Sequence, residues 1–213
     1  IGADAVYDRF TQVLVDKTRN LQVGYGFEPG VFMGPLISEN LRTRFRRFSR
    51  SLVGMGHTML LESEPPTGTG RGFYARPCIL RVNWEEANPV LEVEPPGPTL
   101  LVYRVSDWQE GVALHNQVEA RISTSVFTSP ENPVLGDIRD RLRTGALNIN
   151  RGTIGASLRL PAVGMGTSSN GVLGGLSVLE TLTHPRSQLT KTRDFEGLPK
   201  LPGIRWDLSS TLT

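Results

Sequence analysis

Few side chains in this sequence have the type and spacing that covalent or metal chemistry requires. The chain contains one cysteine, Cys78, and three histidines, and these residues do not form a cluster with the spacing of a metal site. Cys78 lies in the apolar stretch 76–82, which is typical of a strand, and a buried strand thiol is usually inert. The sequence therefore predicts no catalytic residue and no metal ligand within the chain.

Two other segments could in principle contact phosphate groups. Five arginines lie between residues 42 and 50, and the turn-rich stretch 64–72 contains three glycines. A net charge of +2 is too small to indicate a polyanionic partner, so the arginines are interpreted as the solvated face of a helix. No strand and helix flank the glycines in the order of a phosphate-binding loop, so 64–72 is predicted to be a surface loop.

The composition indicates one globular domain. A chain of 213 residues is long enough for a substantial core, and 38% hydrophobic against 21% charged residues excludes a disordered chain. No apolar run approaches the roughly 18 residues of a membrane helix, and residues 1–4 lack the basic segment of a secretory signal. We therefore expect a cytoplasmic protein with no nucleic-acid partner and no membrane partner.

Apolar spacing predicts the elements that must position any site. Helices are expected from Asp4 as N-cap, near Ser38, after the capping-box pattern Ser106-x-x-Gln109, from Pro133 to a cap at Gly145, and over 172–182. The expected apolar faces are Val6, Phe10, Val13 and Leu14 in the first helix, and Leu41, Phe45, Phe48 and Leu52 in the second. Strands are expected over 58–61, 76–82, 99–105, 123–127 and 147–150.

From residue 99 to residue 150 the order is strand, helix, strand, helix, strand, which indicates crossover connections and parallel pairing. The predicted fold class is therefore α/β, with an open, mostly parallel sheet flanked by helices. Residues 1–186 are expected to form this domain. Residues 187–213 are polar and broken by prolines, and we expect them to form an extended C-terminal arm with a role in oligomerisation.

A series of short motifs points to a family. In chain order they are YDRF at 7–10, MGPLIS at 33–38, GFYARP at 72–77, EPPGP at 94–98, SVFT at 125–128, GALNIN at 145–150 and PAVGMG at 161–166. In this order and spacing they resemble the aldehyde dehydrogenase superfamily, from just after its nucleophile to its C-terminus. The stretch 155–170, together with 185–189, most resembles the succinylglutamate-semialdehyde dehydrogenase branch.

The resemblance implies oxidation of an aldehyde by a thiolate nucleophile, with hydride transfer to NAD or NADP. It assigns Glu94 to the cofactor site, as acceptor for the nicotinamide ribose hydroxyls. Pro96 stands where the family has an aromatic beside the nicotinamide, so the cofactor site is degenerate there. Ser157 and Ala162 fall on the substrate channel, where Ala162 replaces an aromatic side chain.

The resemblance places the nucleophilic cysteine and the cofactor-binding half upstream of Ile1. The chain alone is therefore expected to be inactive and to bind no NAD or NADP, and its expected partners are that half or further copies of itself. Further departures lie at Ala120-Arg121-Ile122 and Val163. Such changes are expected in a non-catalytic homologue that keeps the fold as an assembly or binding module. They are equally expected in a divergent branch of the family that is still active. An unrelated small α/β protein with chance motif matches is the third hypothesis.

Overall fold

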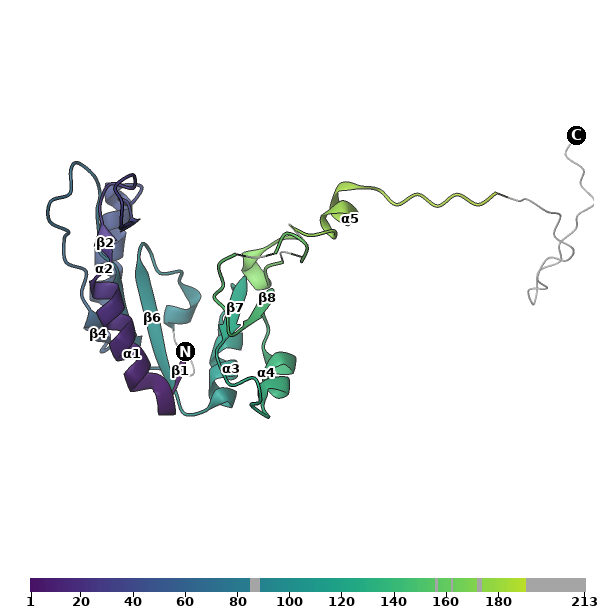
Figure 1. Ribbon diagram of the computed structural model, residues 1–213, viewed down its shortest axis with the longest axis horizontal. Helices are drawn as coiled ribbons and strands as arrows, with labels where there is room; N and C mark the ends of the chain where they lie inside the picture. Colours follow the sequence, from purple (N-terminus) through teal and green to yellow (C-terminus); the bar gives the residue numbers. More distant parts are fainter. Residues whose placement is uncertain (85–88, 156, 162, 172–173, 191–213) are drawn as a thin grey trace, which may run out of the picture.

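The computed structural model describes residues 1–84, 89–155, 157–161, 163–171 and 174–190 (Figure 1). Its elements up to the central strand are β1 (Gly2–Ala3), α1 (Asp4–Arg19), β2 (Gln22–Val23), β3 (Val31–Met33), α2 (Glu39–Gly54), β4 (Thr58–Leu61), β5 (Cys78–Val82), the 3-10 turn η1 (Pro89–Glu92) and β6 (Thr99–Val105). They continue with α3 (Trp108–Gln117), β7 (Ser123–Val126), α4 (Leu135–Arg141), β8 (Ala146–Ile149), the turn η2 (Gly166–Ser168) and α5 (Val178–Leu182).

A four-stranded sheet with the order β1-β6-β5-β4 forms the centre of the molecule. Strands β5 and β6 pair in parallel from Cys78–Thr99 to Val82–Tyr103, β1 pairs in parallel with β6, and β4 is antiparallel to β5. Strands β7 and β8 also pair in parallel, as the crossover order predicts, but in a two-stranded sheet of their own. The α/β class with a mostly parallel sheet flanked by helices is confirmed.

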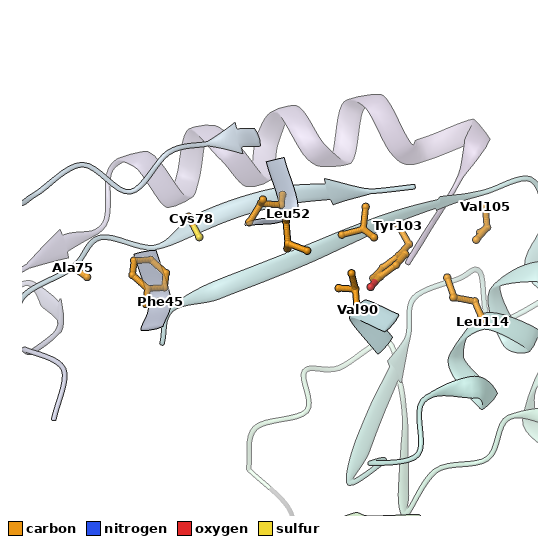
Figure 2. Close-up of a cluster of buried hydrophobic side chains, with 10 residues drawn as sticks. Phe45, Leu52, Ala75, Cys78, Val90, Tyr103, Val105 and Leu114 are labelled. Atoms are coloured by element: carbon orange, nitrogen blue, oxygen red, sulfur yellow. The ribbon is translucent and has the colours of Figure 1, made fainter. Parts of the chain in front are cut away.

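Helices cover both faces of the central sheet, which is why the strand over 99–105 is almost continuously apolar. Ile79 and Val102 pack with Tyr7 of α1 on one face. On the other face, Cys78, Leu80 and Val82 of β5 join Phe45 and Leu52 of α2 and Leu114 of α3 in the main core (Figure 2). This alternation along β5 follows the two-residue period of a strand.

Helix α2 has the face that its sequence predicts. Phe45 and Leu52 are buried, Leu41 and Phe48 are half-buried, and the Ser38 hydroxyl accepts the N-cap hydrogen bond from Leu41 N at 3.1 Å. Among its arginines, Arg42 forms an ion pair with Glu39, whereas Arg44, Arg46, Arg47 and Arg50 are exposed. The exposed arginines form the solvated helix face that we expected.

Of the predicted apolar face of α1, Leu14 packs against the core, and the other three residues are wrong. Tyr7 and Thr11 are buried, whereas Val6, Phe10 and Val13 are 58%, 51% and 46% exposed. The helix carries two adjacent apolar stripes, and two contacts outside it decide which one packs. The Tyr7 ring fits against Gly2, where an added Cβ would lie 3.1 Å from the ring. Arg104 of β6 donates to Asp4 at 2.5 Å and to Asp8 at 3.3 Å, which fixes the rotation of the helix.

Several predicted helix ends also need correction. Asp4 is the first residue of α1 and makes no N-cap bond, because its carboxylate accepts from Arg104. Asp107, and not Ser106, caps α3: it accepts from Glu110 N at 2.8 Å, and Ser106 instead donates to the Glu110 carboxylate. Helix α4 ends at Arg141 with Leu142 as its C-cap, three residues before the expected cap at Gly145. The last helix begins at Val178, and residues 172 and 173 lie outside the described residues.

The described chain after α5 extends away from the rest of the molecule (Figure 1). Residues 187–190 are exposed and belong to no helix or strand. The rest of the predicted arm, 191–213, lies outside the described residues, so the boundary at 186/187 stays a prediction. Among the described helices, none is long and apolar enough to span a membrane.

Candidate functional site

A cleft of about 1170 Å³ lies beside Glu94, the carboxylate to which the motifs pointed. One wall consists of η1, the residues after it and β6, and the other is formed by the end of α3 and the start of β7. Its polar lining comprises Glu92, Glu94 and Glu119, the hydroxyls of Tyr103, Ser123, Thr153, Thr167 and Ser168, and Gln117. A smaller cavity of about 230 Å³, between the end of α1 and β4, contains none of the predicted site residues.

The polar lining determines which ligands the cleft can accept. Glu92, Glu94 and Glu119 are exposed carboxylates, which accept hydrogen bonds and repel anions. Burial raises the pKa of Tyr103 to about 12, so its phenol stays protonated and remains a donor at neutral pH. Among the described residues that line the cleft there is no lysine or arginine. The cleft therefore suits a neutral or cationic group with hydroxyl donors better than a phosphate.

Of the two predicted cofactor residues, Glu94 lines the cleft and Pro96 does not. Pro96 is half-buried in the turn that follows Glu94, and its carbonyl accepts a hydrogen bond from the Thr99 hydroxyl at 2.9 Å. The turn needs glycine at position 97, where φ is +64° and an added Cβ would lie 3.2–3.3 Å from Phe45. Pro96 thus contributes to the shape of the turn, and Glu94 carries the polar group.

Of the two predicted substrate-channel residues, the structure describes Ser157, which does not line this cleft. Ser157 is exposed, its hydroxyl accepts from Arg159 N at 3.3 Å, and it is not among the described residues that line the cleft. Ala162 lies outside the described residues. From this part of the chain the cleft instead receives Thr153, Thr167 and Ser168. No pattern in the sequence distinguishes these three from other loop hydroxyls, and Glu119 carried no motif.

Arg121, at one of the departures from the family pattern, has a structural role. Its guanidinium donates to the carbonyls of Asn116 and Val118 at 2.7 and 2.5 Å, at the C-terminal end of α3. These carbonyls have no partner within the helix, and a cation is favourable at the negative end of the helix dipole. The substitution thus coincides with a stabilised helix end beside the cleft.

Asn150 is the one described residue other than glycine with a positive φ, at +53°. Its side chain accepts from Thr128 N at 2.9 Å and donates to Thr128 O at 2.8 Å. Asparagine tolerates this left-handed conformation better than most residues. The pair of bonds joins the segments that follow β7 and β8, and in the sequence Asn150 stands out only as part of the GALNIN motif.

His115 joins α3 to the strand and loop behind the cleft. Its Nε2 lies 3.1 Å from the Arg143 carbonyl and 3.3 Å from the Thr124 hydroxyl, which donates to Thr144 at 2.8 Å. The neighbouring Asn116 accepts from Arg143 N and donates to Arg141 O, both at 2.9 Å. Burial, reinforced by the charge of Arg121, lowers the pKa of His115 below its ordinary value, so the neutral ring is the native form.

We expect the free energy of unfolding to fall as the pH drops below about 6.5, the ordinary histidine pKa. In that range His115 binds a proton in the unfolded chain, whereas the native ring stays neutral because its pKa is lowered. The free energy of unfolding therefore rises with pH up to about 6.5. Urea unfolding between pH 8 and 5 measures this, with His115→Gln as the control that keeps a donor and does not titrate. Equal pH dependence in both proteins would contradict the assignment.

The comparisons with known proteins come from sequence and from structure. The model of the aldehyde dehydrogenase family matches residues 3–187. Malonate-semialdehyde dehydrogenase of Bacillus cereus (strain AH187) is 31% identical over 161 residues, 75% of this chain and 31% of that protein. Alpha-ketoglutaric semialdehyde dehydrogenase of Bacillus subtilis (strain 168) is 26% identical over 198 residues, 92% of this chain and 37% of that protein.

Because this family model covers most of its residues, the chain belongs to the aldehyde dehydrogenase family. Betaine aldehyde dehydrogenase from Staphylococcus aureus, solved in complex with NAD+, shares the fold with a TM-score of 0.71 at 22% identity, over 84% of this chain and 35% of that one. The chain spans about a third of the length of the curated relatives it matches.

The lining of the cleft suits the nicotinamide ribose of this family's cofactor and does not suit its diphosphate. Glu94 is an exposed acceptor that suits a ribose diol, and the neighbouring hydroxyls add donors and acceptors. The diphosphate would meet three carboxylates and, among the described lining residues, no cation. The described residues also contain no group of three histidine, cysteine or acidic side chains that could hold a metal ion.

Proposed function

We propose that this chain forms the C-terminal catalytic and oligomerisation part of an NAD(P)-dependent aldehyde dehydrogenase. The family match over residues 3–187 carries the proposal, and Glu94 on the rim of the cleft supports it. When bound, the cofactor accepts a hydride from the substrate. In this chain Glu94 would orient the nicotinamide ribose, while residues upstream would supply the thiolate and the diphosphate site. The single cysteine supports a cytoplasmic setting.

A semialdehyde, with an aldehyde at one end and a carboxylate at the other, is the proposed substrate class. Both relatives named above are semialdehyde dehydrogenases by name. The resemblance of 155–170 and 185–189 to the succinylglutamate-semialdehyde branch indicates a long semialdehyde. The three glutamates of the cleft would keep the acid end of such a substrate away from the ribose side.

A chimera tests the proposal. The part of the Bacillus cereus relative upstream of its match would be joined to this chain, so that it supplies the nucleophile and the cofactor-binding half. We expect NADH formation from malonate semialdehyde or a longer semialdehyde by the chimera, and none by the chain alone, whose NAD binding in calorimetry should be weak or absent. A folded chimera without activity would contradict the proposal.

Within the chimera, Glu94→Gln is expected to raise KM for NAD about 10-fold, because charged hydrogen bonds contribute about 1.5–3 kcal/mol. Steady-state kinetics measure this. Glu119→Gln is the matched control: it removes the same charge from the same cleft on another element and should change KM by less than about threefold. Equal effects of the two substitutions would mean that net charge, and not a specific contact, governs binding.

The alternative function is a non-catalytic assembly or binding module. It is supported by Pro96, which replaces the aromatic beside the nicotinamide, and by the stripe Val6, Phe10 and Val13, which α1 leaves exposed. Exposed apolar stripes of this kind mark interaction surfaces. Both functions require an association surface, so the kinetics of the chimera distinguish them and the association state does not.

We expect the chain to self-associate through the α1 stripe and the predicted arm. Phe10→Glu, which places a charge in the stripe, and a version ending at His184 should each shift the chain towards the monomer in light scattering. Phe27→Glu is the control for Phe10→Glu, because Phe27 is 87% exposed in the loop between β2 and β3, outside both α1 and the arm. A monomer for the unmodified chain would contradict the expectation.

A further inference from the structure

The turn that follows Glu94 has few backbone N–H donors. Pro95, Pro96 and Pro98 have no N–H, so Gly97 provides the one backbone donor between residues 95 and 98. Backbone N–H groups of this turn therefore contribute little to holding it in place. The turn must be fixed mainly through its carbonyl oxygens.

Three successive carbonyls of this turn accept hydrogen bonds from the neighbouring strands. Thr99 N donates to Gly97 O at 2.8 Å, and Cys78 N donates to Pro98 O at 3.0 Å. The Thr99 hydroxyl donates to Pro96 O at 2.9 Å. Thr99 begins β6 and pairs with Cys78 of β5, so the starts of two central strands hold the turn. The bond to Pro96 is made by a side chain and can be removed by substitution.

Cys78 supports the Thr99 hydroxyl from the core side. Its thiol is fully buried and donates to Thr99 Oγ1 at 3.8 Å, a distance that suits a sulfur donor. Burial raises the pKa of the thiol, so it keeps its proton. Because the hydroxyl accepts from the thiol, its own proton is free to point towards Pro96 O. The result is a chain of hydrogen bonds from the core to the turn.

We propose that Thr99, supported by the Cys78 thiol, is a positioning residue that holds the Pro95–Gly97 turn and with it Glu94 on the rim of the cleft. The assignment rests on the proposed function for its catalytic meaning, since Thr99 acts through Glu94. Phe45 of α2 also packs against Gly97. The two backbone bonds hold Gly97 O and Pro98 O, whereas the hydroxyl bond fixes Pro96 O, the bonded carbonyl nearest to Glu94 in the chain.

The order parameters of the Val93, Glu94 and Gly97 amides, from ¹⁵N relaxation of the full chain, test this proposal. Thr99→Val keeps the volume and removes the donor, and it should lower these values from about 0.8 to below about 0.6. Thr99→Ser keeps the hydroxyl and should restore them. Thr58→Val, which removes a hydroxyl that accepts from Arg81 on the other flank of β5, is the matched control and should leave the turn unchanged.

In the chimera, Thr99→Val should raise KM for NAD about fivefold, the equivalent of one ordinary hydrogen bond, and leave kcat within about twofold. Unchanged order parameters in Thr99→Val, their loss in Thr99→Ser, or unfolding of Thr99→Val would each overturn the proposal. So would an effect on kcat without one on KM. An inactive chimera bears on the proposed function alone, because the order parameters are measured on the chain itself.

Discussion

Replacing Phe45 with alanine is expected to lower the free energy of unfolding by about 3–5 kcal/mol, the usual result of deleting a buried aromatic ring. Phe45 is 1% exposed and lies in the main core with Leu52 and Ala75 (Figure 2). The ring also fills the space that Gly97 leaves open. The cavity would therefore open beneath the turn that carries Glu94, where glycine and prolines cannot expand to fill it. Urea unfolding followed by circular dichroism measures the change.

The matched control for this substitution is Phe32→Ala. Phe32 is 64% exposed on β3, so its removal should change the free energy of unfolding by less than about 1 kcal/mol. A loss below about 1 kcal/mol for Phe45→Ala would mean that α2 is not anchored through this ring. In that case the assignment of the main core would be wrong.

The first two helices illustrate which parts of the fold are predictable from sequence. In α2 the apolar residues recur on a single stripe, so the 3.6-residue period identifies the buried face without ambiguity. In α1, two stripes lie side by side, and Gly2 and Arg104, on β1 and β6, decide between them. Periodicity within a helix cannot contain that information, because it depends on where other strands pack.

The candidate site shows the same division. Glu94 could be singled out because its flanking prolines and glycine form a motif; it lines the cleft, and its contact with the cofactor stays a prediction. Thr99 carries no such signal: its role arises from the register that sets it opposite Cys78. Thr153 reaches the cleft from a loop, and Thr167 and Ser168 reach it from η2, which follows the long-range bridge between Arg121 and Met165. Parallel pairing of β7 and β8 was predictable, whereas their separation from β6 was not.

Replacing Gly145 with alanine is expected to lower the free energy of unfolding by about 3 kcal/mol, at the upper end of the usual effect of overpacking. An added Cβ would lie 1.6 Å from Val163 O and 2.8 Å from Ile122 O. Both atoms belong to the backbone, so no side-chain rotation relieves the clash. The 163–165 segment would have to leave Arg121, two residues before β7, to which Met165 is bound through two backbone hydrogen bonds of 3.2 and 2.8 Å. The close approach involves the carbonyl of Val163 and not its side chain, so valine is tolerated at 163 while glycine is required at 145.

Gly136→Ala is the matched control: the added Cβ meets nothing within 4 Å in α4, and the better helix propensity of alanine should raise stability by about 0.5–1 kcal/mol. Thermal and urea unfolding of the two variants measure both changes, and a Gly145→Ala protein as stable as the unmodified chain would show that the 163–165 segment does not pack against β7 and β8.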